Sequence, residues 1–224
     1  MTKTSRRELF KKSALMLSGV ALAPTLGMGS GLLAAKNKKH LYPLPPGAVS
    51  LERFRNRCTA CQLCVSRCPT QVLKPALWEN GLTGFMQPIL KYEVHQFCEF
   101  ECKECIDVCP NDALTKISLE EKKLTQIGLV KLVLEECIVI KDDEACGACA
   151  EHCPTKALRM VPYKGNLTQP EITHPEVCIG CGACESICPE LKEAIYIERH
   201  EVHEQAEPPI VEKQEDVDIT DFGF

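Results

Sequence analysis

The stretch that decides the fold is CIGCGACESICP at residues 178–189, where four cysteines are spaced C-x2-C-x2-C-x3-C and followed by proline. Near copies occur in RCTACQLCVSRCPTQVL (57–73), ECKECIDVCPNDAL (101–114) and ACGACAEHCPTKAL (145–158). One cysteine unit is therefore used four times along the chain. All sixteen cysteines fall into its four groups, which are Cys58-Cys61-Cys64-Cys68, Cys98-Cys102-Cys105-Cys109, Cys137-Cys146-Cys149-Cys153 and Cys178-Cys181-Cys184-Cys188.

The spacing of groups one and four is the run with which bacterial proteins hold [4Fe–4S] clusters. A tight loop lets three cysteines spaced two residues apart surround one cube. The fourth cysteine lies about one helical turn beyond the third and precedes a proline, so it points away from that cube and ligates another. The sequence predicts four [4Fe–4S] clusters, with all sixteen cysteines as iron ligands.

Groups two and three depart from the simple run in their first spacing. Three residues separate Cys98 from Cys102, and eight separate Cys137 from Cys146. Both groups keep the C-x2-C-x3-C-P ending, and the first ligand only has to reach its iron. A longer first loop is therefore tolerable, although it makes group three the weakest of the predicted sites.

Three other interpretations of the cysteines are less favoured. Structural zinc commonly uses two C-x2-4-C pairs, which does not account for triplets followed by Cys-Pro. A disulfide framework would suit an exported protein but seldom repeats one motif four times. Cys98, Cys102 and Cys105 also match the signature of enzymes that cleave S-adenosylmethionine. However, Cys109 completes that group, and no sequence long enough for their barrel remains.

Short apolar, β-branched stretches lie beside the cysteine groups and are predicted strands. Together they predict an α+β fold of duplicated, ferredoxin-like two-cluster modules, with short strands and short helices around four [4Fe–4S] clusters. A large apolar core is not required, because cluster ligation supplies much of the folding free energy. The predicted strands are Ala113–Ile117, Ile127–Leu134, Ala157–Val161 and Ala194–Ile197.

The first residues, MTKTSRRELFKK (1–12), resemble the twin-arginine export signal, with Ser5 before the arginine pair. No charged residue occurs from Ser13 to Ala35, and several glycines make that stretch only moderately apolar. We therefore predict export to the periplasm, by a route that carries folded, cluster-loaded proteins. An uncleaved segment tethering the protein to the inner membrane stays open as the alternative, because the stretch is long enough to span a bilayer.

The composition of residues 36–224 predicts a linker, a core and a tail. Residues 36–50 are rich in lysine and proline and predict an extended linker, and residues 51–200 are the predicted four-cluster core. Residues 201–224 hold eight acids and one lysine, which predicts a disordered tail. The chain carries a net charge of −5, and the five bases and one acid of residues 1–35 leave the rest at −9. Such an acidic protein is not expected to bind nucleic acid.

The arginine pair, the four cysteine groups and their Cys-Pro endings together resemble the NapG/MauM-type periplasmic ferredoxins, from Ser5 to about His200. The resemblance implies electron relay between a membrane quinol dehydrogenase and an exported reductase. It also implies membrane association through the partner or an uncleaved signal. The alternative is an electron-transfer subunit stably bound to a larger oxidoreductase, such as a molybdenum enzyme. We find no catalytic residues in the sequence and expect no substrate site of the protein's own.

Two points stay open from the sequence. In tandem pairing, Cys109 completes the first cube and Cys68 the second, whereas in nested pairing Cys188 completes the first cube. The similar gaps between groups do not choose between these arrangements. Acids around group two predict a low reduction potential for its cluster, because negative charge disfavours adding an electron. These acids are Glu99, Glu101, Glu104 and Asp107.

Overall fold

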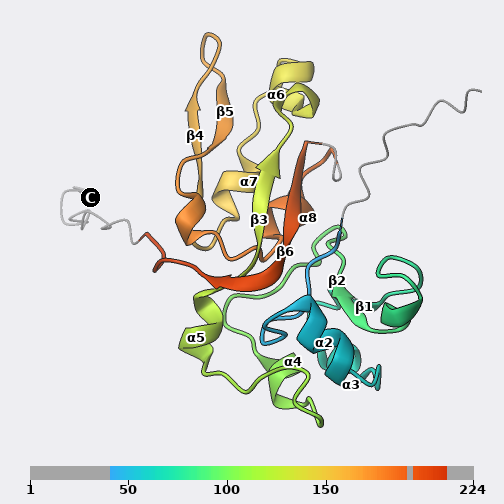
Figure 1. Cartoon of the computed structure of the whole chain (residues 1–224). Coiled ribbons are helices and arrows are strands. Elements are labelled where there is room, and N and C mark those ends of the chain that lie inside the picture. The colour runs from blue at the N-terminus through green and yellow to red at the C-terminus, as the bar shows by residue number, and fades with distance from the viewer. Residues whose placement is uncertain (1–40, 191–193, 211–224) are drawn as a thin grey trace, which may run out of the picture. The chain divides into compact units, whose positions relative to one another are not determined.

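The computed structural model in Figure 1 describes residues 41–190 and 194–210. The chain divides into the units Met1–Lys38 and Lys39–Phe224, and every described residue belongs to the second unit. The predicted export segment at residues 1–35 lies outside the described residues. Within the described ranges, no helix is long and apolar enough to cross a membrane.

The described chain mixes short helices with short strands, as predicted (Figure 1). The α-helices are α2 (Leu51–Arg57), α3 (Leu63–Arg67), α4 (Glu104–Asp107), α5 (Leu119–Lys123), α6 (Ile138–Lys141), α7 (Ala148–Glu151) and α8 (Ala183–Ile187), and the 3-10 helices are η1 (Leu82–Gly84), η2 (Leu134–Glu136) and η3 (Pro175–Val177). The strands are β1 (Leu73–Pro75), β2 (Pro88–Leu90), β3 (Thr125–Leu132), β4 (Leu158–Pro162), β5 (Thr168–Ile172) and β6 (Ile195–Gln205).

An antiparallel hairpin separates the two cysteine groups of each module. β1 pairs with β2 between groups one and two, and β4 pairs with β5 between groups three and four. β3 and β6 enclose groups three and four and pair antiparallel, with Leu132 opposite Ile195 and Thr125 opposite Gln205. Figure 1 shows these two strands side by side. The arrangement is consistent with a duplicated two-cluster module.

Three of the four predicted strands overlap β3, β4 and β6, but the prediction for Ala113–Ile117 is wrong. This segment lies beside residues 43–50 and makes one backbone hydrogen bond with them, from Thr115 N–H to Gly47 O (2.8 Å). The neighbouring segment contains Pro43, Pro45 and Pro46, which have no N–H to donate. A regular ladder therefore cannot form at this edge.

The predicted linker at residues 36–50 is wrong over its described part. Leu44 and Ala48 are fully buried, and Pro43 O accepts a hydrogen bond from Leu90 N–H (2.9 Å). The Ser50 side chain then caps α2 by accepting from the backbone N–H of Arg53. The core therefore begins before Leu51, because the apolar residues among the prolines pack against the first module.

The predicted start of the tail at residue 201 is also too early. β6 continues to Gln205, and the buried Ala206 donates its N–H to Leu124 O (2.7 Å). Ile210 packs against the main core. The acidic composition of this stretch does not prevent folding, because Glu201 and Glu204 are exposed to solvent while the backbone of Glu204 pairs with Gln126 of β3. Residues 211–224 lie outside the described residues.

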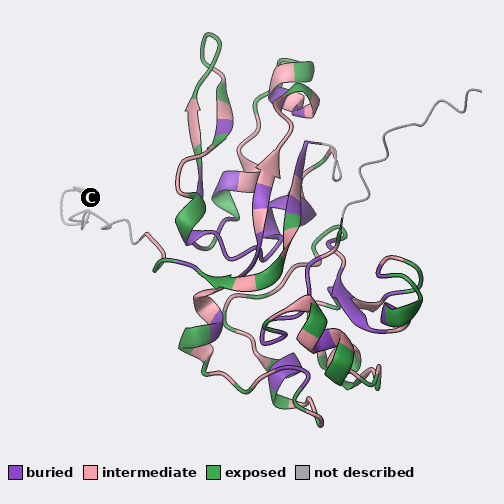
Figure 2. Cartoon of the chain, viewed as in Figure 1, coloured by how far each residue is buried: buried purple, intermediate pink, exposed green. Residues whose placement is uncertain are grey.

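Tyr92 joins the two modules at their centre. Its side chain is 1% exposed, and its hydroxyl donates to Gly180 O (2.6 Å). Gly182 has a φ of +77°, and a Cβ added there would lie 2.1 Å from the Tyr92 ring. The residues buried around this contact include most of α8, as Figure 2 shows. Only glycine therefore satisfies both the backbone and the packing at position 182.

We expect Gly182→Ala to destabilise the protein by about 1–3 kcal/mol more than Gly165→Ala, because only the former adds a clash in the core. Gly165 is the matched control, since its φ is +60° and no atom lies within 4 Å of an added Cβ. Thermal unfolding of anaerobic protein, followed by far-ultraviolet circular dichroism, measures the difference. Equal effects of both substitutions would contradict the packing of Tyr92 on Gly182.

Candidate metal centres

The sixteen cysteines gather in four sets, each made of three cysteines from one group and the last cysteine of the neighbouring group. Sets I, II and IV each line one cavity. In set III, burial raises the pKa values of Cys149 and Cys188, and the electrostatic effects of its thiols on one another, which add to this rise, identify the set. This is the tandem pairing within each module. Set I is Cys58, Cys61, Cys64 and Cys109; set II is Cys98, Cys102, Cys105 and Cys68; set III is Cys137, Cys146, Cys149 and Cys188; and set IV is Cys178, Cys181, Cys184 and Cys153.

The chemistry of these sets fits a cube better than a disulfide framework. All sixteen cysteines are free thiols in the structure. The cavities have apolar walls, such as Val72, Leu73 and Leu90 around set II, so the thiolates supply the charge that binds iron. Among the described residues, no three His, Cys, Asp or Glu side chains are placed to hold a single metal ion.

Left-handed backbone turns point the first three cysteines of a group inward. In group four, Gly180 and Gly182 have φ values of +71° and +77°, and α8 begins directly afterwards. In group one the corresponding residues, Ala60 and Gln62, adopt the same region with φ of +54° and +64°. Glycine is the favoured residue for this conformation, so the glycines of group four are the clearest sequence signal of the loop.

The fourth cysteine ends a helix and turns the chain away from its own group. Cys68 follows α3 and donates its N–H to Val65 O, and Cys188 follows α8 and donates to Glu185 O. Both have extended backbone angles, as expected for a residue before proline. The helix end therefore places the last thiol in the neighbouring set.

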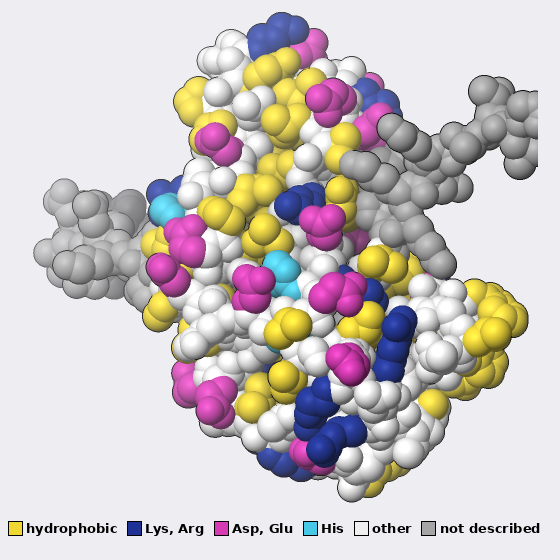
Figure 3. All heavy atoms as spheres, viewed as in Figure 1, with side chains coloured by type: hydrophobic (Ala, Val, Ile, Leu, Met, Phe, Trp, Pro, Cys, Tyr) yellow, Lys and Arg dark blue, Asp and Glu magenta, His cyan; other side chains and the backbone are white. Residues whose placement is uncertain are grey.

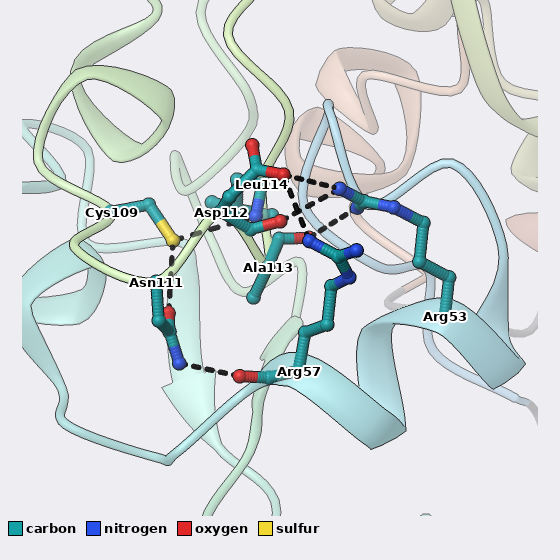
Figure 4. A network of polar contacts seen from close by, with 7 residues as sticks. All are labelled: Arg53, Arg57, Cys109, Asn111, Asp112, Ala113 and Leu114. Atoms are coloured by element: carbon teal, nitrogen blue, oxygen red, sulfur yellow. Dashed lines mark hydrogen bonds and ion pairs between the residues drawn. The ribbon is translucent and has the colours of Figure 1, made fainter.

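A polar network holds Cys109 against group one (Figure 4). Asp112 accepts from both Arg53 and Arg57 at 3.0 Å, and these arginines belong to α2 directly before Cys58. Asn111 donates to Arg57 O, and the Cys109 thiol lies 3.5 Å from Asn111 Oδ1. The segment after group two is thereby fastened to the helix that leads into group one.

Burial keeps these thiols protonated when no metal is bound. It raises the pKa of Cys64, Cys149 and Cys181 to about 12, and neighbouring cysteines add to the effect. It also raises the pKa of Cys105 and Cys184 well above the usual value. Because the metal ligand is the thiolate, iron binding must displace these protons.

The sets are neighbours in the order I, II, IV, III. Helix α3, which carries Cys64 of set I, packs against α4, which carries Cys105 of set II. In the same way α7, with Cys149 of set III, packs against α8, with Cys184 of set IV. Sets II and IV meet where Cys98 N–H donates to Cys181 O (2.8 Å). The spatial order therefore differs from the order of the groups in the sequence.

Hydroxyl side chains that follow the Cys-Pro pairs were missed by the sequence reasoning. Thr70 Oγ1 lies 3.6 Å from Cys68 Sγ, and Thr155 Oγ1 lies 3.7 Å from Cys153 Sγ. Thr70 donates its hydroxyl proton to Phe97 O (2.7 Å), so Thr155 is the residue whose hydroxyl is available to a ligating sulfur, a hydrogen bond that tunes a cluster's potential. The shared Cys-Pro-Thr sequence was the signal that could have revealed both residues.

The pairing predicts which cysteine substitutions act on the same site. Cys68→Ser and Cys105→Ser should each remove about four irons per chain, and the double variant should also lose only about four, because both belong to set II. Cys64→Ser with Cys68→Ser should lose about eight, because these two neighbours in sequence serve different sets. Iron analysis of anaerobically purified protein measures the losses. A loss of about eight irons from the Cys68/Cys105 double variant would contradict the tandem pairing.

Comparison with known proteins also indicates [4Fe–4S] binding by the cysteine groups. The family model described as a 4Fe-4S dicluster domain matches residues 97–157 and 144–192, and a 4Fe-4S binding domain matches residues 55–71. The "Methylamine utilization ferredoxin-type protein MauM" of Methylobacillus flagellatus is 29% identical over 194 residues, which cover 83% of this chain and 80% of that protein.

Two proteins of Escherichia coli K12 are also similar. The "Ferredoxin-type protein NapG" is 29% identical over 153 residues, which cover 64% of each chain. The "Ferredoxin-type protein NapF" is 25% identical over 145 residues, covering 65% of this chain and 79% of that protein. The resemblance inferred from the cysteine groups is thereby confirmed: the chain is a homologue of the MauM and NapG ferredoxin-type proteins.

Proposed function

We propose that this protein relays single electrons through four [4Fe–4S] clusters, one held by each of sets I to IV. The observation that carries the proposal is the gathering of all sixteen thiols into four sets of four, which follow one another in the order I, II, IV, III. The clusters would supply the one-electron chemistry. The protein's own residues fix the order of the sites and set their electrostatic surroundings.

The burial of the cysteines supports sets I and III as the two ends of the relay. Cys61 of set I is exposed, and residues 141–145 beside Cys146 of set III are exposed as well. In set IV, by contrast, Cys178, Cys181 and Cys184 are all buried. Electrons would therefore enter or leave at sets I and III, and cross between the modules where Cys98 meets Cys181.

We expect anaerobic protein to take up about four electrons per chain reversibly, one for each cluster. A fully reduced sample should give an electron paramagnetic resonance spectrum with magnetic interactions between neighbouring clusters. Cys184→Ser should remove the cluster of set IV and leave set III with an isolated, uncoupled signal.

Cys146→Ser is the matched control for that experiment. It should remove the cluster of set III at one end and leave no isolated signal, since sets I, II and IV remain neighbours. An isolated signal in Cys146→Ser but not in Cys184→Ser would overturn the proposed order. Failure of the wild-type protein to accept electrons reversibly would overturn electron transfer itself.

We further propose that the redox partners are a membrane quinol dehydrogenase and an exported reductase. The homology to MauM and NapG supports a place in a redox chain. The charge of −9 outside residues 1–35 suits contact with basic patches on partners, and Figure 3 shows acidic side chains dispersed among basic ones on one face. The alternative is a subunit stably bound to a larger oxidoreductase, and co-purification of a large catalytic chain would distinguish the two.

Export to the periplasm by the twin-arginine route is part of the same proposal. Arg6→Lys with Arg7→Lys should leave the protein in the cytoplasm, because the paired arginines are the feature that the route reads. Lys11→Arg with Lys12→Arg is the control that also conserves charge and should be exported normally. Fractionation of cells, with immunodetection of the full chain, measures the outcome. Equal export of both variants would contradict the proposal.

A further inference from the structure

Lys122 is a buried lysine whose ammonium group lies beside set II. Lys122 is 2% exposed, and its Nζ donates hydrogen bonds to Glu99 O and to Phe100 O (3.0 Å). It belongs to α5, whose start is fixed by a capping box between Ser118 and Glu121. The short helix therefore holds a positive charge against the loop between the first two cysteines of group two.

The partner of this charge is the cysteine site itself. Glu99 and Phe100, whose carbonyls accept from the ammonium, directly follow Cys98, so the charge lies beside a ligand of set II. The ion pairs formed among residues 41–190 and 194–210 do not include Lys122. A buried charge is costly unless it is paired, and carbonyl groups carry only partial charges. A cluster with its thiolates would supply the missing negative charge.

Three of the four acids that suggest a low potential for group two are balanced by other cations, and the fourth, Glu99, is exposed to solvent. Glu101 pairs with Lys123 at 2.9 Å, and Asp107 pairs with Lys103 at 3.0 Å. Glu104 lies 3.5 Å from Arg67. The three carboxylate side chains are 62%, 48% and 49% exposed, respectively, so solvent also screens their charges. Among these groups in the described structure, the ammonium of Lys122 is the charge that is both buried and outside the ion pairs.

We propose that Lys122 raises the reduction potential of the cluster held by set II. Reduction adds one negative charge to a cluster, and a cation buried beside it stabilises the reduced form more than an exposed cation would. The inference rests on the proposed electron-transfer function. It gives the inner cluster of the first module a greater tendency to accept electrons than its acidic sequence indicates.

Lys122→Gln is the sharpest test, because an amide can still donate to the carbonyls of Glu99 and Phe100 while the charge is lost. We expect the midpoint of one cluster to fall in Lys122→Gln, and to remain near the wild-type value in Lys122→Arg. Redox titration followed by electron paramagnetic resonance gives the midpoints. Lys122→Met, which keeps the length of the chain without a charge, repeats the test if the Gln variant does not fold.

Lys123→Gln is the matched control, since it removes the same charge one residue away. Lys123 is paired with Glu101 and Glu120 outside the core, so its loss should shift the midpoint less. The Lys122 effect should disappear in Cys105→Ser protein, which lacks the cluster of set II.

Iron and sulfide content is measured first, because it distinguishes a failure of the proposed role of Lys122 from a failure of the proposed function. Variants that keep wild-type cluster content with unchanged midpoints, or an equal fall in Lys123→Gln, would overturn the role of Lys122 alone. Protein that holds no cluster in any variant would overturn the proposed function and this inference with it.

Discussion

The rest of the structure depends on the exchange of the last cysteine between neighbouring groups. Groups one and four each end a short helix at a Cys-Pro pair, and the extended backbone there sends the thiol into the adjoining set. A cluster in each set would therefore cross-link two segments that lie far apart in the sequence. Such cross-links would hold in place helices of four to seven residues, which are too short to be stable alone.

The two modules use this exchange in the same way but differ in how their outer edges close. In the second module β3 and β6 form a regular ladder, whereas in the first module proline removes the donors that a ladder needs. The modules meet through Tyr92 and the hydrogen bond from Cys98 to Cys181, which brings sets II and IV together. The contact between modules thus determines the order of the sites, and with it the route proposed for electrons.

The sequence predicted the features that are encoded locally. Cysteine spacing identified the four groups, and proline after each group indicated that the fourth thiol leaves its own loop. Features that depend on distant partners were not predictable in this way. The burial of Leu44 within a proline-rich stretch and the extension of β6 to Gln205 both require surfaces supplied by the folded modules. Likewise, Lys122 is one of two adjacent lysines in the sequence, and only the packing of α5 shows which one is buried.

The most direct test of the central claim is the content of iron, acid-labile sulfide and zinc per chain in protein purified without oxygen. Four cubes held by sixteen thiolates predict about sixteen irons and about sixteen sulfides, with no stoichiometric zinc. About twelve of each would mean that one site is empty, and set III, with its long first loop, would be the first to examine. Zinc without sulfide would contradict the account, because the cysteine sets would then be structural metal sites with no capacity to carry electrons.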